Sequence, residues 1–236
     1  QLIMAINKNS NLYTFGFAFA MVVIVGTLLA IASEGLKELQ EKNANDKKMI
    51  NILGAINVDA NRSNAKQLYE KYVIDSKIIS GNDSNAEAFT IDIKKEFRDK
   101  NLNIADRNYP LYECRKEGNT YFVIPVVGNG LWGPIWGFVA LESNYRTVYG
   151  ATFNHKQETP GLGAEINQSS YSSQYSGESI SDIAGIFQPI EVVKDGSGYG
   201  INSKVDGITG GTITSKGVEE MTNRTLEVYV NYFNSL

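Results

Sequence analysis

A long uncharged segment near the amino terminus constrains this chain more than any other feature. Residues 12–32, LYTFGFAFAMVVIVGTLLAIA, contain no Asp, Glu, Lys or Arg. A helix rises about 1.5 Å per residue, so this segment is just long enough to span a bilayer core of about 30 Å. The alternative is a cleavable signal peptide, because residues 30–32 read Ala-Ile-Ala, but the apolar run is long for one. The sequence therefore favours a retained transmembrane helix.

The transmembrane segment predicts a chain of four parts. Residues 1–11 are a short tail, 12–32 the transmembrane helix, 33–75 a helical stalk, and 76–236 one extracytoplasmic domain. Within the stalk, apolar residues recur only intermittently, and a second helical piece is expected after the possible cap Ser63.

Composition excludes several classes of protein. The chain has 236 residues, a net charge of −4 and no Lys/Arg cluster, which argues against a nucleic-acid-binding surface. With one Cys and one His, it cannot form an intramolecular disulfide or a cysteine- or histidine-rich metal centre. A Ser-His-Asp triad would have to use His155, and GGTITSKG lacks the spacing of a phosphate-binding P-loop.

The second half of the chain has the pattern of an antiparallel sheet. Alternating β-branched and aromatic residues, separated by glycine-containing turns, predict successive strands. These strands are expected within 109–118, 119–128, 135–143, 144–156 and 187–196. Helical spacing after Ser215 predicts a terminal helix, residues 89–97 fit either a strand or a helix, and 167–182 read as a loop. We therefore expect an α+β fold, with a twisted antiparallel sheet flanked by helices.

Three glycine-rich segments are candidates for binding. They are GNGLWGPIWG (128–137), ETPGLGAE (158–165) and DGITGGTITS (206–215). Glycine lets the main chain approach a ligand, and an indole can lie against a planar ring. The third segment precedes a helix, whose start favours a phosphate. Together they suggest a nucleotide-like cofactor such as a flavin, although each alone also fits an ordinary turn, with Trp132 in the core.

In their order along the chain, these segments resemble the FMN-binding domain family of membrane-bound, ion-pumping electron-transfer complexes. In particular, they resemble the C subunit of the Na+-translocating NADH:quinone oxidoreductases. The matching parts are the amino-terminal span, GNGLWGPIWG, HKQETPGLGAE, VKDG, DGITGGTITS and the terminal helix. They cover essentially the whole chain. The related G subunit of the Rnf complex shares only the span, the TPGLG segment and the threonine loop.

The resemblance implies a covalent cofactor. In this family, FMN forms a phosphoester with the last threonine of an S/T-G-A-T motif, which here reads TGGT at residues 209–212. Thr212 is therefore the implied acceptor. Gly211 stands where the family has alanine, which predicts a more flexible loop. Asp206 matches the acidic residue before the motif, and Thr214 matches a hydroxyl after it.

The resemblance also implies which residues surround the flavin. They are Leu131, Trp132, Glu158, Thr159, Leu162 and Gly163, with Lys194 as a further cation. No catalytic acid, base or metal ligand is expected in this chain, because the flavin itself accepts and passes electrons.

The implied partners are the other subunits of the complex, a flavin transferase and the lipid bilayer. Electrons would come from an iron–sulfur centre and pass to another subunit's flavin. The expected location is a bacterial inner membrane, crossed once, with the large domain on the periplasmic side; Lys8 gives a mild preference for an inside amino terminus. Two alternatives stay open: a protein like the G subunit of the Rnf ferredoxin:NAD complex, and a flavin-free, membrane-anchored binding or assembly module.

Overall fold

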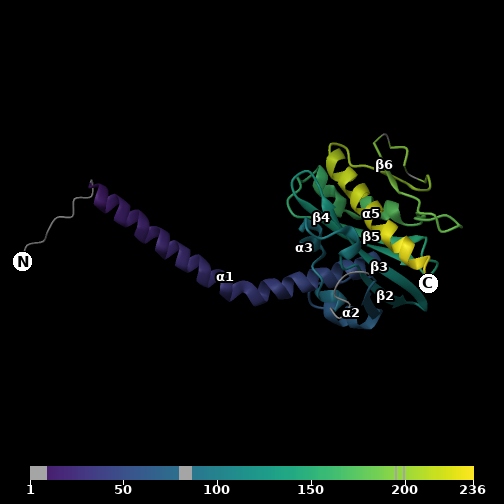
Figure 1. Cartoon of the computed structure of the whole chain (residues 1–236), viewed down its shortest axis with the longest axis horizontal. Helices are drawn as coiled ribbons and strands as arrows, with labels where there is room; N and C mark the ends of the chain where they lie inside the picture. The colour runs from purple at the N-terminus through teal and green to yellow at the C-terminus, as the bar shows by residue number, and fades with distance from the viewer. Residues whose placement is uncertain (1–9, 80–86, 195, 199) are drawn as a thin grey trace, which may run out of the picture. The chain divides into compact units, whose positions relative to one another are not determined.

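The computed structural model describes residues 10–79, 87–194, 196–198 and 200–236 (Figure 1). The chain divides into two compact units, with the boundary between Asn45 and Asp46. Apart from residues 10 and 11, the predicted tail lies outside the described residues.

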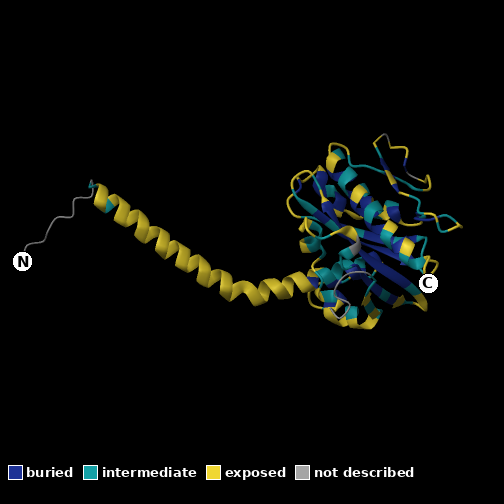
Figure 2. Ribbon diagram, viewed as in Figure 1, coloured by how far each residue is buried: buried dark blue, intermediate teal, exposed yellow. Residues whose placement is uncertain are grey.

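One long helix makes up the described part of the first unit. Helix α1 covers Asn11–Ala55, and the Tyr13 amide donates to Ser10 Oγ at 3.2 Å in its first turn. Its most apolar stretch is not buried at all, as the yellow ribbon in Figure 2 shows. By its length and composition, α1 is able to cross a membrane.

A five-stranded sheet forms the centre of the second unit. Its strand order is β1-β2-β3-β4-β5, and every neighbouring pair is antiparallel. The strands are β1 Val73–Ile78, β2 Pro110–Lys116, β3 Asn119–Asn129, β4 Pro134–Glu142 and β5 Val148–His155. Glu117 and Gly118 connect β2 to β3 with φ angles of 52° and 83°, the left-handed values that a two-residue hairpin turn requires.

Side chains alternate between two hydrophobic clusters, one on each face of the sheet. The terminal helix α5, Thr212–Phe233, packs along β3 on one face and buries Val218, Met221 and Tyr229 there (Figure 1). On the other face, Ile52 and Leu53 from the last turns of α1 join Tyr112 and Val123 in the second cluster. The predicted α+β fold is confirmed.

Short elements complete the second unit. The remaining helices are α2 Ala65–Tyr72, α3 Ile93–Arg98 and α4 Ser169–Ser172, with 3₁₀ turns η1 Ala88–Thr90, η2 Ile104–Asp106, η3 Gly163–Asn167 and η4 Ser173–Tyr175. Strands β6 Glu191–Val193 and β7 Lys204–Asp206 pair in parallel as a separate two-stranded sheet.

The four central predicted strands are confirmed, whereas several surrounding predictions are wrong. The strand expected over 187–196 is reduced to the three residues of β6, and its partner β7 was not predicted. The segment 167–182, expected to be a loop, contains α4 and η4. Residues 89–97, left ambiguous, form the end of η1 and most of α3.

The predicted second helix is shorter than expected. Its pattern suggested a helix through residue 75, but α2 ends at Tyr72, because the β-branched residues that follow pair with β2 as β1. Ser63 does not cap it, since its N–H and hydroxyl both donate to Asn61 Oδ1. The N-cap position is Asn64, which makes no side-chain capping bond.

Glycines allow α5 to lie directly on β3. A Cβ at Gly217 would lie 2.2 Å from the Asn129 carbonyl oxygen, and a Cβ at Gly128 would lie 2.7 Å from the Met221 Cβ. The start of α5 is therefore fixed against the end of β3, next to the first glycine-rich segment.

We expect Gly217→Ala to lower the free energy of unfolding by about 1–3 kcal/mol, because the methyl group would overpack this contact. A decrease in stability would distinguish overpacking from helix propensity, because Gly→Ala inside a helix otherwise raises the free energy of unfolding by up to about 1 kcal/mol. Urea unfolding of the detergent-purified chain measures the change. The control is Asn231→Ala, at an exposed position of α5, which should change the stability by no more than about 0.5 kcal/mol. A Gly217→Ala protein as stable as the parent would contradict the close contact.

Candidate functional site

A buried carboxylate, that of Glu158, joins the three glycine-rich segments. This residue is 4% exposed. Its Oε1 accepts a hydrogen bond from the Trp132 backbone N–H at 2.8 Å, and its Oε2 accepts one from the Thr214 hydroxyl at 2.6 Å. One side chain thus holds the loop after β3, the segment after β5 and the first turn of α5.

Two glycines make room for this carboxylate. A Cβ at Gly130 would lie 2.6 Å from Glu158 Oε1, and a Cβ at Gly163 would lie 2.4 Å from Thr214 Oγ1. A larger residue at either position would displace the Glu158–Thr214 pair. In the structure these glycines bring the backbone close to Glu158, and their approach to a ligand stays a prediction.

Further hydrogen bonds fix the Trp132 loop. The Gly130 N–H donates to the Gly133 carbonyl at 2.8 Å, and Gln157 Nε2 donates to the Trp132 carbonyl at 2.6 Å. His155, the only histidine of the chain, accepts a hydrogen bond at Nδ1 from the Glu158 N–H at 3.1 Å. Its contact is therefore with the turn that presents the carboxylate.

The second glycine-rich segment folds as a compact turn. The Thr159 carbonyl accepts hydrogen bonds from the N–H groups of Leu162 and Ala164, both at 3.1 Å. Gly161 has a φ of 75°, and its N–H donates to Glu165 Oε1 at 2.8 Å. Thr159 thus contributes its carbonyl to the turn while the residue itself stays exposed.

The threonine loop leads directly into α5. The Gly211 N–H donates to the Ile208 carbonyl at 2.9 Å, and the Ser215 N–H donates to the Gly211 carbonyl at 2.9 Å. Ser215 Oγ accepts a hydrogen bond from the Ile208 N–H at 3.0 Å. Helix α5 therefore begins at Thr212, and the prediction that it starts only after Ser215 is wrong. The last hydroxyls of the segment lie in its first turn.

Thr212 differs from the hydroxyl residues around it. Thr214 and Ser215 are both buried, and both of their hydroxyls are engaged in hydrogen bonds. Thr212 is half-buried, and its hydroxyl has no hydrogen-bond partner in the part of the chain that the structure describes. Thr209 is exposed in the turn before the helix.

Apolar side chains stay exposed in the same loops. Trp132 is 58% exposed, so it does not belong to the core, and Leu131, Leu162 and Ile213 are exposed as well. Leu162 covers the threonine loop, because a Cβ at Gly210 would lie 2.6 Å from Leu162 Cδ2. Of these residues, Ile213 was missed by the sequence analysis, since it lies between threonines of a segment expected to be a loop.

Lys194 is not tied to this site by any contact that the described residues show. It is exposed and directly follows β6. The neighbouring Val193 carbonyl accepts a hydrogen bond from the Gly207 N–H at 2.7 Å, which brings the backbone next to Lys194 close to the start of the threonine loop. Asp195 of the VKDG segment lies outside the described residues.

A glutamine absent from the sequence prediction holds the start of the threonine loop. Gln174 accepts a hydrogen bond from the Asp206 N–H at 2.7 Å and donates to the Asp206 carbonyl at 3.3 Å. The Asp206 carboxylate accepts one from the Gly198 N–H at 2.8 Å. Gln174 lies in the Ser/Tyr-rich run, where no sequence pattern distinguishes it.

Comparisons with known proteins agree with this arrangement. The FMN-binding domain model matches residues 130–227, which contain Glu158 and both of its partners, Trp132 and Thr214. The chain is 32% identical over 235 residues to the C subunit of the Na(+)-translocating NADH-quinone reductase of Vibrio anguillarum, with 92% of this chain and 90% of that protein covered. Identity to the corresponding Vibrio alginolyticus subunit is 30% over 234 residues, with the same coverage.

A solved structure extends the agreement to the fold. The crystal structure of the C subunit of the Na(+)-translocating NADH-quinone reductase from Parabacteroides distasonis matches with a TM-score of 0.76 at 35% identity. The match covers 85% of this chain and 98% of that one. The resemblance expected from the order of the motifs is confirmed: this chain belongs to the family of the C subunits of the Na+-translocating NADH-quinone reductases, which are parts of an oxidoreductase complex, and contains their FMN-binding domain.

Proposed function

We propose that this chain is the electron-transfer subunit of a sodium-transporting NADH:quinone reductase and carries FMN as a phosphoester on Thr212. In this role it accepts electrons from an iron–sulfur centre and passes them to the flavin of another subunit, as the resemblance of its motifs implies. One observation carries the proposal: the Thr212 hydroxyl has no partner among the described residues, at the first residue of a helix that Glu158 ties to the exposed Trp132.

The start of α5 suits a phosphate group. The backbone N–H groups of Thr212, Ile213 and Thr214 precede the first bond of the helix, from the Ser215 N–H to the Gly211 carbonyl. Such N–H groups have no acceptor within the helix, and they coincide with the positive end of its dipole. No residue of the first turn is itself acidic, and the Glu158 carboxylate that reaches this turn is bonded to the Thr214 hydroxyl.

The hydrogen bonds of the segment favour one hydroxyl for modification. Thr214 is engaged with Glu158 and Ser215 with Ile208, so a phosphoester on either would break a contact that holds the site. Thr212 has no such contact. Gly210, with a φ of 74°, is exposed beside it, so a flavin transferase that takes FMN from FAD can reach this backbone on the side that Leu162 does not cover.

The exposed apolar residues provide a surface for the ring system. The loop that Glu158 connects to the helix contains Leu131 and Trp132. The neighbouring turn contains Leu162, which lies against Gly210 of the threonine loop. An indole packs well against a planar aromatic ring. When bound, FMN supplies the acceptance and release of single electrons. The chain's own contribution is to anchor, orient and shield it, and the exposed Lys194 is a cation able to stabilise negative charge there.

The amino-terminal helix defines the setting of this chemistry. We propose that α1 crosses the bacterial inner membrane once, in contact with lipid and with other subunits, and that the second unit lies on the periplasmic side. The apolar stretch of α1 supports the crossing, and the lysine before it supports the orientation.

We expect Thr212→Ala to lose covalent flavin in membranes that contain an active flavin transferase, because the neighbouring buried hydroxyls are already engaged. Fragmentation mass spectrometry of the tryptic peptide 205–216 locates the adduct, and flavin fluorescence in denaturing gels measures its amount. Thr209→Ala is the matched control and should keep the flavin on Thr212. Flavin located on Thr209 or Thr214 in the parent protein would refute the assignment, and an unmodified parent peptide would favour the flavin-free module.

We expect Glu158→Ala to lower the free energy of unfolding by about 2–3 kcal/mol, because it leaves the Trp132 N–H and the Thr214 hydroxyl without their acceptor. Covalent flavin on Thr212 should fall in parallel, since the segments lose their common contact. The matched control is Glu165→Ala, which removes one acceptor from a more exposed turn and should cost about 1 kcal/mol or less. Equal effects of the two substitutions, measured by urea unfolding, would contradict the joining role of Glu158.

The orientation can be tested with a single engineered thiol. Cys114 is buried, and burial raises the pKa of its thiol to about 12, so it should not react with maleimides at neutral pH. Ser170→Cys places a thiol on an exposed position of the second unit. We expect a membrane-impermeant maleimide to label it in right-side-out vesicles and not in sealed inside-out vesicles, with the parent protein as the unlabelled control. The reverse pattern would place the domain on the cytoplasmic side.

A further inference from the structure

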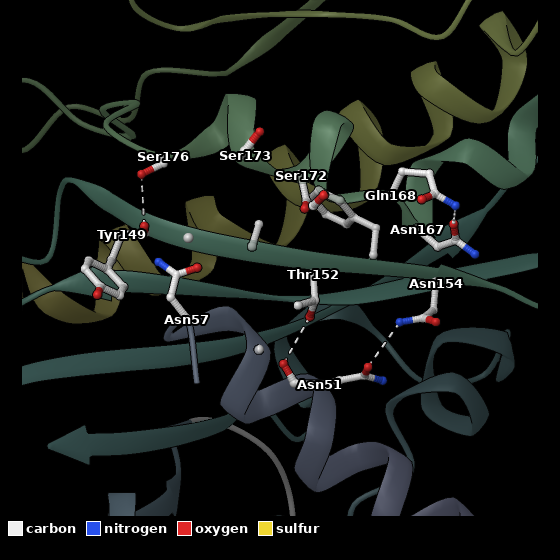
Figure 3. A pocket seen from close by; sticks show the side chains of 15 residues that line it. Asn51, Asn57, Tyr149, Thr152, Asn154, Asn167, Gln168, Ser172, Ser173 and Ser176 are labelled. Carbon is white, nitrogen blue, oxygen red and sulfur yellow. Dashed lines mark hydrogen bonds between the residues drawn. The ribbon is translucent and has the colours of Figure 1, made fainter. Parts of the chain in front are cut away.

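A cleft of about 630 Å³ lies along β5, the last strand of the sheet, and is separate from the Glu158 site (Figure 3). Its floor is the run from Tyr149 to Asn154. One wall includes Asn51 from the end of α1, and the other includes Ser172 and Ser173 from α4 and η4, as Figure 3 shows. All of these residues belong to the second unit.

The outer edge of β5 carries unpaired backbone groups in this cleft. The Lys156 N–H donates to the Pro134 carbonyl, so Lys156 is hydrogen-bonded to the β4 side. Along an antiparallel strand, residues bonded to one neighbour alternate with residues whose backbone groups point the other way. Thr152 and Asn154 then bond to β4, whereas the N–H and C=O groups of Ala151 and Phe153 point away from it. No hydrogen bond from these outward groups to any described residue is seen.

The chain covers only the beginning of this edge. The Val148 N–H donates to the Glu178 carbonyl, and the Gly177 N–H donates to the Val148 carbonyl, both at 2.8 Å. The Tyr149 carbonyl accepts a side-chain hydrogen bond instead, from Ser176 Oγ at 3.0 Å. Beyond this point η4 and α4 pack beside β5 without continuing the strand pairing, so the row of backbone bonds stops before Ala151. Ala151 and Phe153 are 8% and 2% exposed, because the walls of the cleft lie close to this edge.

The lining of the cleft is uncharged. Asparagine, glutamine, serine and threonine side chains surround the strand edge, and no Asp, Glu, Lys or Arg is among the lining residues that the structure describes, although 20% of the chain is charged. Gly54 and Gly150 let the end of α1 lie directly against β5, because a Cβ at Gly54 would lie 2.9 Å from Thr152 Cγ2 and one at Gly150 would lie 2.7 Å from the Ala55 carbonyl oxygen. A charged side chain placed here would lose hydration without finding an opposite charge.

We propose that this cleft receives an extended, uncharged segment of a partner subunit, which pairs with the edge of β5 as an added strand. The incoming backbone would bond to the outward groups of Ala151 and Phe153, and so continue the row that residues 177 and 178 begin. Strand addition of this kind takes its affinity from the main chain and its specificity from alternate side chains. Small, neutral side chains such as Ser, Thr, Asn and Ala fit these walls.

The walls favour a single strand over a second copy of this chain. An edge-to-edge pair of two β5 strands would bring the end of α1 and the α4–η4 segment of each copy against those of the other. A segment without flanking helices meets no such obstacle. Membership in a family of complex subunits provides the partner chains, and the inference does not depend on where the flavin is attached.

Amide hydrogen exchange, resolved to single residues, tests the proposal on the intact complex and on the isolated full-length chain in detergent. We expect the amides of Ala151 and Phe153 to exchange roughly tenfold or more slowly in the complex than in the isolated chain. The amides of Thr152 and Asn154, which already bond to β4, are internal controls and should change little. Slow exchange at all four positions in the isolated chain, or equal exchange of Ala151 and Phe153 in both samples, would overturn the proposal.

A second experiment introduces a charged side chain into the cleft. Ser173→Lys places an ammonium group on the wall, and Ser170→Lys makes the same change at an exposed serine of α4 that does not line the cleft. We expect Ser173→Lys alone to restore fast exchange at Ala151 and Phe153 and to reduce the amount of this subunit that copurifies with the complex. Flavin on Thr212 should be unchanged in both variants.

Three results would contradict the partner strand. Both lysine variants could weaken assembly equally, which would assign the effect to charge rather than to the cleft. Protection in the isolated chain could rise with its concentration, which would identify a second copy as the occupant. Protection in the complex could persist in Ser173→Lys, which would place the protecting contact outside the cleft.

Discussion

The carboxylate of Glu158, withdrawn from water between three loops, is the contact on which the site depends. A buried charge is costly unless hydrogen bonds replace its hydration. Here the Trp132 N–H and the Thr214 hydroxyl supply them, and Gly130 and Gly163 leave the space. Because the donors come from segments far apart in the sequence, the arrangement requires all three segments together with the packing of α5 on β3.

The sheet and the order of the motifs could be predicted from the sequence because both are local properties. Strands β2 to β5 follow one another along the chain, with alternating side chains and short turns, so each could be recognised without knowing its partners. The contacts that build the site are not local. Nothing in the residues near Glu158 shows that its partner is Thr214, and nothing near Gln174 shows that it holds Asp206.

The wrong predictions have two physical causes. Strands β6 and β7 have three residues each, too few for a local pattern, and β1 is formed by pairing with β2, which lies beyond η1, α3 and η2 in the sequence. The late start predicted for α5 has a local origin. Glycine and threonine favour turns locally, yet the hydrogen bonds of Ser215 with Ile208 and Gly211 draw the threonine segment into the first turn of the helix.

The departure from the family motif at Gly211 also has a different meaning in three dimensions. Glycine in place of alanine predicted a looser loop, but Gly211 has φ −104° and ψ 26°, values open to other residues, and its N–H is bonded to Ile208. A Cβ there would lie 3.0 Å from Ile208 Cγ2 and 3.2 Å from the Gly163 N. The limiting quantity at this position is therefore space rather than backbone freedom. With Ile208 packed against it, glycine at position 211 leaves the space in which the loop closes on the second glycine-rich segment.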